Sequence, residues 1–224
     1  AEEYRALASE LNSALADSLG VNIPIVAAGQ VDDSRLEAEN CIALGIFPFN
    51  PVVEKLYIRE FVACDYSWPN GDDSYVIRTV HDPWLSGTNV VFVGSAHESG
   101  MQQAVTRFAD LAAQSGGILD PIIEVNDADA EETPAQEQLE QMHEAIDAET
   151  SSRAMGGTAA SYCDRYFRTG DAVWTELFLH SMRKLDELQA AEGAADDVRS
   201  CRYIFMQWDR IEEGPAFSDD QRRE

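Results

Sequence analysis

The feature that most constrains the fold is a change of hydrophobic periodicity on either side of one polar segment, NDADAEETP. Before this segment, helical stripes alternate with short runs of β-branched and aromatic residues; after it, only the helical period continues. The segment itself is acidic and ends in proline, which is typical of a linker. The chain therefore predicts an α/β domain over 1–125, an acidic linker over 126–136 and a helical domain over 137–224.

The first domain is predicted to contain a mixed β-sheet with helices packed against it. Apolar residues at helical spacing predict helices over 3–19 and 98–113. A further helix is predicted to begin at Pro51, with Asn50 as its cap, because proline favours the first helical position and asparagine the position before it. Strands are predicted over the apolar runs 21–26, 40–45, 75–80 and 89–93, and the run over 118–125 is either a last strand or an extended crossing segment.

Four helical stripes follow the linker and predict antiparallel helices with short connections. The last stripe is predicted to bury Val198, Cys201, Phe205, Trp208 and Ile211. The opposite face of that helix then presents an aromatic, an amide and a guanidinium side chain, a combination that suits a sugar-binding cleft and equally an ordinary solvated face. The candidate substrate-binding residues are therefore Tyr203, Gln207 and Arg210.

Tryptophans are a second class of candidate sugar contacts, since an exposed indole can stack on a sugar ring. Trp174 and Trp208 lie on apolar helical stripes, so we interpret both as core residues. Trp68 and Trp84 lie in loops of the first domain, where packing is favoured over sugar stacking.

The charge is unusual and excludes one class of partner. Forty-one acidic residues oppose sixteen basic residues, for a formal net charge of -25. Binding of nucleic acid through a basic patch is therefore excluded. The acids either form a surface adapted to high salt or belong to an ordinary acidic exported protein. The chain has no apolar run near the ~20 residues that cross a bilayer, so no membrane span is predicted.

No metal or cofactor is expected. The four cysteines include no CxxC pair, although an even number leaves a disulfide open in an exported protein. The four histidines show neither an HExxH motif nor paired spacing. Asp127 and Asp129 alternate as in a calcium loop, but the glycine and terminal glutamate of such a loop are not at the required offsets.

The remaining motif, GSAHESG over 94–100, follows a predicted strand and opens a predicted helix. This is the place where nucleotide-binding proteins hold a phosphate, but the GxGxxG spacing and the GK[ST] ending are both absent. A tight turn between strand and helix is favoured, and a nucleotide-binding regulator stays a minor alternative. Carboxylates are too abundant for an acid–base pair to be chosen, so the catalytic residues are unknown.

The order of the first half is similar to that of a known type of accessory domain. Its segments are ASELNSALADSLGVNIPIV, NCIALGIFPFNPVVEKL, DDSYVIRTV and NVVFVGSAHESGMQQAVTRFADL. This succession resembles the non-catalytic N-terminal α/β domain of α-glucuronidases and β-hexosaminidases. In the second half, YCDRYFRTGDAVWTELFLHSMRKL and CRYIFMQWDRIEEGPAFSDDQRR resemble the first helices of an (α/α) toroid, as in heparinase-like polysaccharide-degrading proteins.

The resemblance implies an N-terminal accessory region of a larger carbohydrate-active enzyme, either a polysaccharide lyase or a glycoside hydrolase. It further implies an extracellular or periplasmic location, a polysaccharide or oligosaccharide as partner of the full-length protein, and no complete active site in this chain. The alternative is a stand-alone acidic extracellular binding or structural protein.

Overall fold

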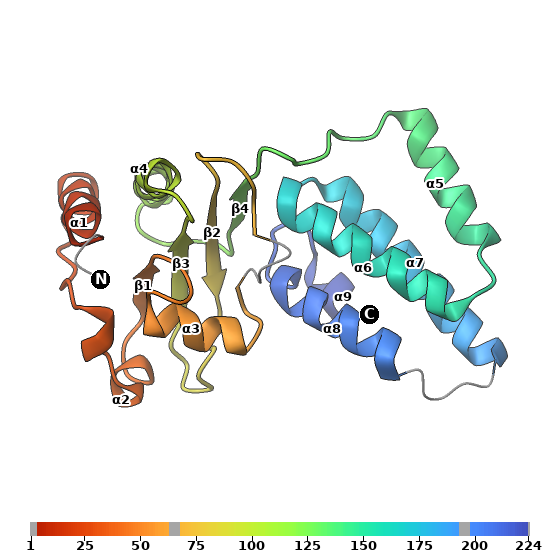
Figure 1. Cartoon of the computed structure of the whole chain (residues 1–224), viewed down its shortest axis with the longest axis horizontal. Helices are drawn as coiled ribbons and strands as arrows, with labels where there is room; N and C mark the ends of the chain where they lie inside the picture. Colours follow the sequence, from red (N-terminus) through yellow and green to blue (C-terminus); the bar gives the residue numbers. More distant parts are fainter. Residues whose placement is uncertain (1–3, 63–67, 193–197, 224) are drawn as a thin grey trace. The chain divides into compact units, whose positions relative to one another are not determined.

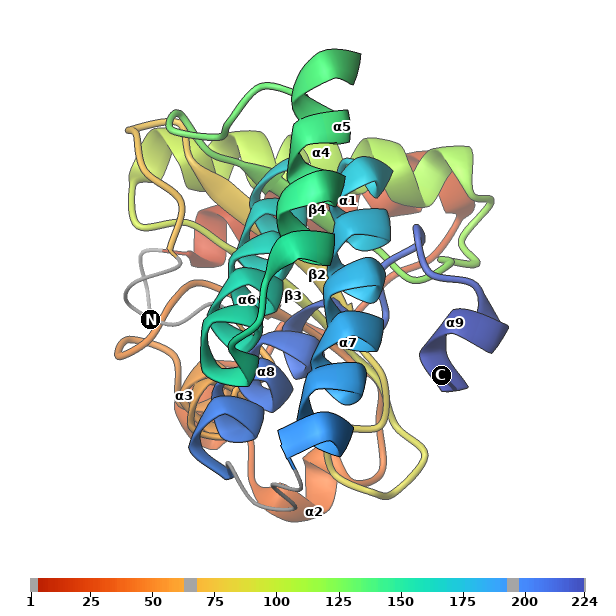
Figure 2. The same cartoon turned by 90° about the vertical axis from the view of Figure 1, so that its right-hand side faces the viewer.

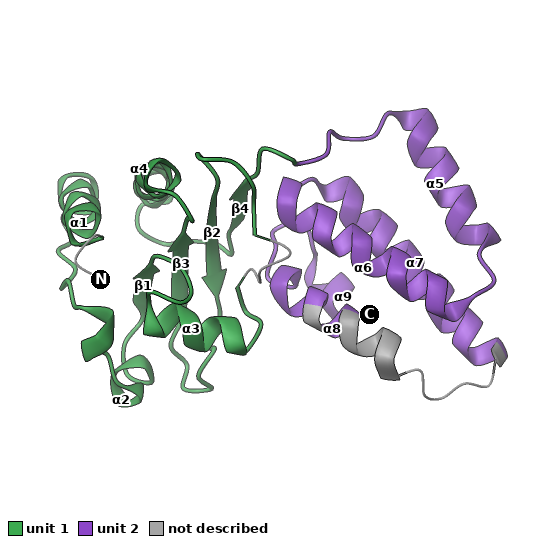
Figure 3. Ribbon diagram, in the orientation of Figure 1, with its two compact units in different colours: residues 1–129 green, residues 130–224 purple. Residues whose placement is uncertain are grey.

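The chain folds into two compact units, which are described separately. The computed structural model describes residues 4–62, 68–192 and 198–223, apart from the side chains of 192, 198–203 and 206. Unit 1 comprises residues 1–129 and unit 2 residues 130–224 (Figure 3). The boundary between the units falls within the segment predicted to be a linker.

Unit 1 is built on a four-stranded mixed sheet with the order β1-β3-β2-β4 (Figure 1). The strands are β1 (Cys41–Leu44), β2 (Tyr75–Val80), β3 (Val90–Gly94) and β4 (Ile123–Asn126). β1 and β3 are parallel, whereas β2 is antiparallel to both β3 and β4. A mixed sheet in the first half of the chain was predicted, and this prediction is confirmed.

Helices α1 (Arg5–Leu19) and α4 (Glu98–Gln114) lie side by side and cover one face of this sheet. Their buried side chains join those of the sheet in one apolar cluster, whose central members are Leu11, Leu15, Ile77, Val93, Met101, Val105 and Phe108. The described residues of the unit also form three shorter helices: η1 (Ala28–Gln30), α2 (Asp33–Leu36) and α3 (Pro51–Ile58). The two long helices were predicted over almost the same residues.

Local signals in the sequence explain where two of these helices begin or end. The Asn50 side chain accepts hydrogen bonds from the amides of Val52 and Val53, so it caps α3 as predicted. Gly20 ends α1 in the left-handed conformation at φ 71°, which glycine adopts without steric cost.

One predicted strand is absent, and another is shorter than predicted. Residues 21–26 form no strand. Two amides of this segment are not available to a sheet, because Pro24 has no amide hydrogen to donate and the Ile23 amide donates to the Asn12 side chain of α1 at 2.7 Å. The run over 118–125 forms a strand only at its end, as β4 (Ile123–Asn126).

A charged cluster ties β4 and β2 to α4. The Arg107 guanidinium binds both carboxylate oxygens of Glu124, with Nε–Oε1 at 2.7 Å and Nη2–Oε2 at 2.8 Å. The Tyr75 hydroxyl donates to the same Oε1 at 3.0 Å. Burial and this hydrogen bond to a carboxylate raise the pKa of Tyr75 to about 12.

All the regular secondary structure among the described residues of unit 2 is helical (Figure 2). Its helices are α5 (Gln136–Ala148), α6 (Ser152–Thr169), α7 (Ala172–Glu192), α8 (Val198–Ile211) and α9 (Asp219–Arg223). α6 packs against both α7 and α8, and α5 packs against α7. The core contains Met155, Cys163, Tyr166, Phe167, Trp174, Leu177 and Ile211. A purely helical second half was predicted, and no strand occurs among the residues described there.

α6 and α7 form a hairpin whose corner is the sequence Thr169-Gly170-Asp171. Gly170 ends α6 in the left-handed conformation at φ 67°. Asp171 then starts α7, because its Oδ1 accepts from the Val173 amide at 3.1 Å. Only two residues connect the helices. Because so short a connection must reverse the direction of the chain at once, α6 and α7 run antiparallel. Within the described part of the chain, no helix combines the length and apolar character that crossing a membrane requires.

Candidate functional site

Two of the three predicted sugar-binding residues are buried. Gln207 and Arg210 are 0% and 1% exposed, whereas Phe205, predicted to face the core, is 63% exposed. The side chain of Tyr203 lies outside the described part of the structure. The predicted orientation of α8 about its axis is therefore wrong, and Gln207 and Arg210 do not form an exposed face.

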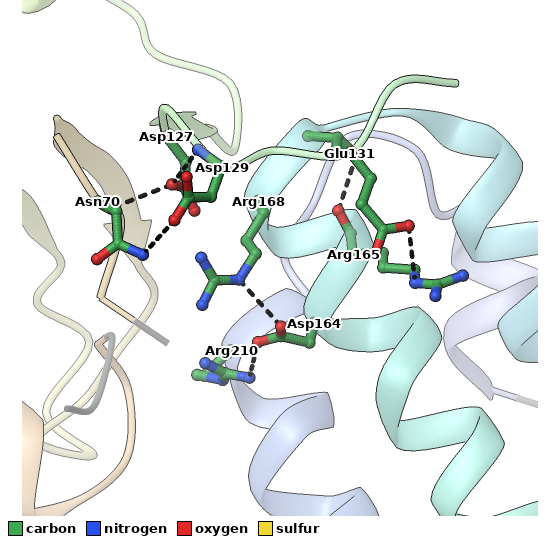
Figure 4. Close-up of polar contacts among 9 residues, drawn as sticks. Asn70, Asp127, Asp129, Glu131, Asp164, Arg165, Arg168 and Arg210 are labelled. Atoms are coloured by element: carbon green, nitrogen blue, oxygen red, sulfur yellow. Dashed lines mark hydrogen bonds and ion pairs between the residues drawn. The ribbon is translucent and has the colours of Figure 1, made fainter. Parts of the chain in front are cut away.

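Electrostatics explain why Arg210 points inward. Its Nη2 lies 3.5 Å from Asp164 Oδ1 (Figure 4). Its guanidinium also lies over the ring of Phe167, 5.0 Å from the ring centroid. Arg168 approaches the other oxygen of the same carboxylate at 3.0 Å. A buried guanidinium needs both a counter-charge and flat surface to contact, and α6 supplies both. We therefore assign Arg210 a structural role in joining α8 to α6.

The tryptophans also pack. Trp174 is buried in the core of unit 2, as predicted, and Trp208 stacks on Phe178 with the ring centroids 5.7 Å apart. Trp68 is half-buried and packs edge-to-face with Phe92, with the ring centroids 6.3 Å apart. The guanidinium of Arg59 lies 5.0 Å above the Trp84 ring, so one face of this indole is covered.

The acidic alternation at the end of unit 1 is a turn held by amide groups. Asp127 Oδ1 accepts from the Asn70 and Asp129 amides at 2.9 and 3.0 Å, and Asp129 Oδ2 accepts from Asn70 Nδ2 at 2.7 Å (Figure 4). These bonds tie the end of β4 to the loop before β2. The two carboxylates thus accept hydrogen bonds from amide groups of the turn. This role accounts for the alternation of Asp127 and Asp129 without a calcium ion.

The segment over 94–100 is likewise satisfied by the protein itself. Ser95 Oγ donates to Ser74 O at 2.6 Å, and the Gly100 amide donates to Asp72 O at 3.2 Å. Ser99 Oγ also donates to Asp72 O, at 2.7 Å. The first turn of α4 is therefore packed against the start of β2, as expected for a tight strand-to-helix turn.

A cavity of about 230 Å³ lies along the outer edge of β1, between α1 and the segment around 23–31. Its lining is mostly apolar and includes Cys41. Burial raises the pKa of the Cys41 thiol to about 11, so the thiol stays protonated and is a poor nucleophile. Cys41 and Cys163 are free thiols, while Cys64 and the side chain of Cys201 lie outside the described residues.

The strongest candidate site is a hydrogen-bonded chain of two histidines and one carboxylate in unit 2. His143 and Asp147 lie one turn apart on α5, and His180 lies on α7. The two Nδ1 atoms are 2.7 Å apart, and His180 Nε2 lies 2.8 Å from Asp147 Oδ1. The imidazole rings are stacked, with centroids 4.9 Å apart and planes inclined by 29°.

This geometry determines where the protons are. An ionised carboxylate only accepts hydrogen bonds, so His180 Nε2 carries a hydrogen and donates it to Asp147. In neutral His180 the Nδ1 then has a lone pair, which accepts from Nδ1–H of His143. If the hydrogen of His143 moves from its Nδ1 to its Nε2, both rings stay neutral and the two Nδ1 lone pairs face each other.

This site is not apparent in the sequence, because the two histidines are 37 residues apart and share no motif. Only the packing of α5 on α7 brings the rings together. The one signal within the sequence was the spacing of His143 and Asp147, which places an imidazole and a carboxylate on one face of a helix.

Comparison of the chain with protein families, curated proteins and solved structures finds no match.

Proposed function

We propose that this chain is the N-terminal accessory region of a larger carbohydrate-active enzyme, a polysaccharide lyase or glycoside hydrolase, and that catalysis requires parts outside it. The observation that carries the proposal is the corner between α6 and α7. The resemblance to an (α/α) toroid rests on the YFRTGDAVW sequence, and in this chain that sequence joins two antiparallel helices through Gly170 and Asp171.

The order of the two units supports the same proposal. A mixed sheet flanked by helices precedes a set of helical hairpins, which is the order implied by the resemblance. A toroid needs about a dozen helices, so this region would supply only its first members. The burial of Gln207 and Arg210 moves the proposed sugar contacts away from α8 and is consistent with a cleft formed elsewhere in the larger enzyme.

The proposal is tested by comparing the complete product of the encoding gene with this chain alone. Both are incubated with uronic-acid polysaccharides, and unsaturated products are followed by ultraviolet absorbance while hydrolysis is followed by new reducing ends. We expect the complete product to degrade a polysaccharide and this chain to produce nothing.

Two results contradict the proposal. Turnover by this chain alone would show that it holds a complete active site. A gene product that ends at Glu224 and binds polysaccharide without cleaving it would instead support the alternative, a stand-alone acidic binding or structural protein.

A further inference from the structure

We propose that His143 and His180 form a binding site for a divalent cation that favours imidazole ligands, with Zn²⁺ as its representative. The two Nδ1 atoms belong to two different helices and face each other at 2.7 Å, so a cation that enters between them would contact both. Neutral imidazole nitrogens are the usual ligands of zinc in proteins. The site does not depend on the proposed role in carbohydrate degradation.

Asp147 prepares His180 for this role. By accepting a hydrogen bond from His180 Nε2 at 2.8 Å, it keeps the hydrogen on the nitrogen that faces away from His143. The Nδ1 lone pair is then available to a cation. Histidine ligands of metals commonly donate their second nitrogen to a carboxylate in this way, which orients the ring and strengthens the ligand.

The distances require only a small adjustment. Zn–N bonds of about 2.0–2.1 Å at a tetrahedral angle place the two nitrogens about 3.3 Å apart. With these bond lengths, the two Nδ1 atoms must therefore move apart by about 0.6 Å. The side chain of His180 is 27% exposed, so the ring has room for this movement.

Binding of the cation would change the tautomer of His143 and release no net proton. In the metal-free pair, the hydrogen between the two Nδ1 atoms belongs to His143, and it moves by way of solvent to Nε2 of His143 as the metal bonds form, so both rings stay neutral. No group of three or more His, Cys, Asp or Glu side chains suited to a metal occurs among the described residues, so water completes the coordination. The binding is consequently weaker than at a four-ligand structural site, and the formal net charge of -25 raises the local concentration of cations.

The test must separate this site from general binding to 41 acidic residues. Zn²⁺ is titrated calorimetrically into the full chain at neutral pH in millimolar Mg²⁺, which prefers oxygen ligands and occupies exposed carboxylates. We expect one Zn²⁺ site that survives Mg²⁺ and is lost in both His143→Ala and His180→Ala. Asp147→Asn should weaken it by about 10- to 100-fold, as is typical when the outer partner of a metal ligand is removed.

His97→Ala is the matched control, because His97 lies in unit 1 and its side chain is half-exposed. This variant should bind Zn²⁺ as the parent chain does. Imidazole ¹⁵N spectra give a second measurement that does not depend on the stability of the alanine variants. On addition of Zn²⁺, the Nδ1 resonances of His143 and His180 should shift to metal-bound positions while His180 Nε2 stays protonated.

Three results would overturn the proposal: no Zn²⁺ binding in Mg²⁺, equal binding in the parent chain and both alanine variants, or Nδ1 resonances unchanged by Zn²⁺. Any of these would leave the pair as a hydrogen bond that joins α5 to α7.

Discussion

Replacing Gly100 with alanine tests whether close contact between α4 and the start of β2 determines the stability of unit 1. Gly100 is the third residue of α4, where alanine would ordinarily favour the helix by up to about 1 kcal/mol. A Cβ at this position, however, would overlap the carbonyl oxygen of Ser74 and the Oγ of Ser95. These two atoms are hydrogen-bonded to each other at 2.6 Å, so neither is free to move alone.

The overlap should outweigh the gain in helix propensity. Forcing extra volume into a packed site costs about 1–3 kcal/mol, and a backbone obstacle places the cost near the upper end. After subtraction of the propensity term, we expect Gly100→Ala to destabilise unit 1 by about 2 kcal/mol. Gly157→Ala is the matched control, because Gly157 lies inside α6 and a Cβ there would meet nothing within 4 Å. It should stabilise unit 2 by about 0.5–1 kcal/mol.

Hydrogen exchange measured on peptides reports on each unit separately. For Gly100→Ala, amides of α4 and β2 that exchange through opening of unit 1 should do so about 30-fold faster, since each 1.4 kcal/mol corresponds to a factor of ten. Amides of α6 should be unchanged. If Gly100→Ala is as stable as the parent chain or more stable, the inferred contact between α4 and β2 does not constrain this position.

Two further predictions concern ionisation and salt. Folding raises the pKa of Tyr75 from its ordinary value of 10.0 to about 12, so on raising the pH the unfolded chain loses this proton first. The stabilisation is complete below about pH 10 and is lost between pH 10 and 12, following proton linkage. Over this range, the free energy of unfolding measured in urea should therefore fall more steeply with pH for the parent chain than for Tyr75→Phe. Parallel plots of this free energy against pH would refute the prediction. If the acidic surface is adapted to salt, Tm should rise between low and molar KCl, because the Debye length falls from about 10 Å at 0.1 M to about 3 Å at 1 M. A flat Tm would indicate an ordinary acidic protein.

Those features that depend on neighbouring residues were determined by the sequence itself. Asn50 followed by Pro51 specified the start of α3, and the run of aromatic and β-branched residues over 75–80 specified β2. The change of periodicity near residue 130 separated a mixed α/β part from a helical part. Each of these depends on local backbone preference or on which faces of one element are apolar, and both are visible in a short stretch of sequence.

Only the tertiary structure decided features that depend on a partner distant in the sequence. Residues 21–26 read as a strand, but the Asn12 side chain takes the Ile23 amide. The buried face of α8 was set by the carboxylate of Asp164 on α6, which draws a charged residue inward against the apolar pattern. The histidine pair arises because α5 packs on α7, and no spacing along the chain encodes that contact. Periodicity records which residues are apolar, whereas the energy of a paired polar group depends on what another element brings to it.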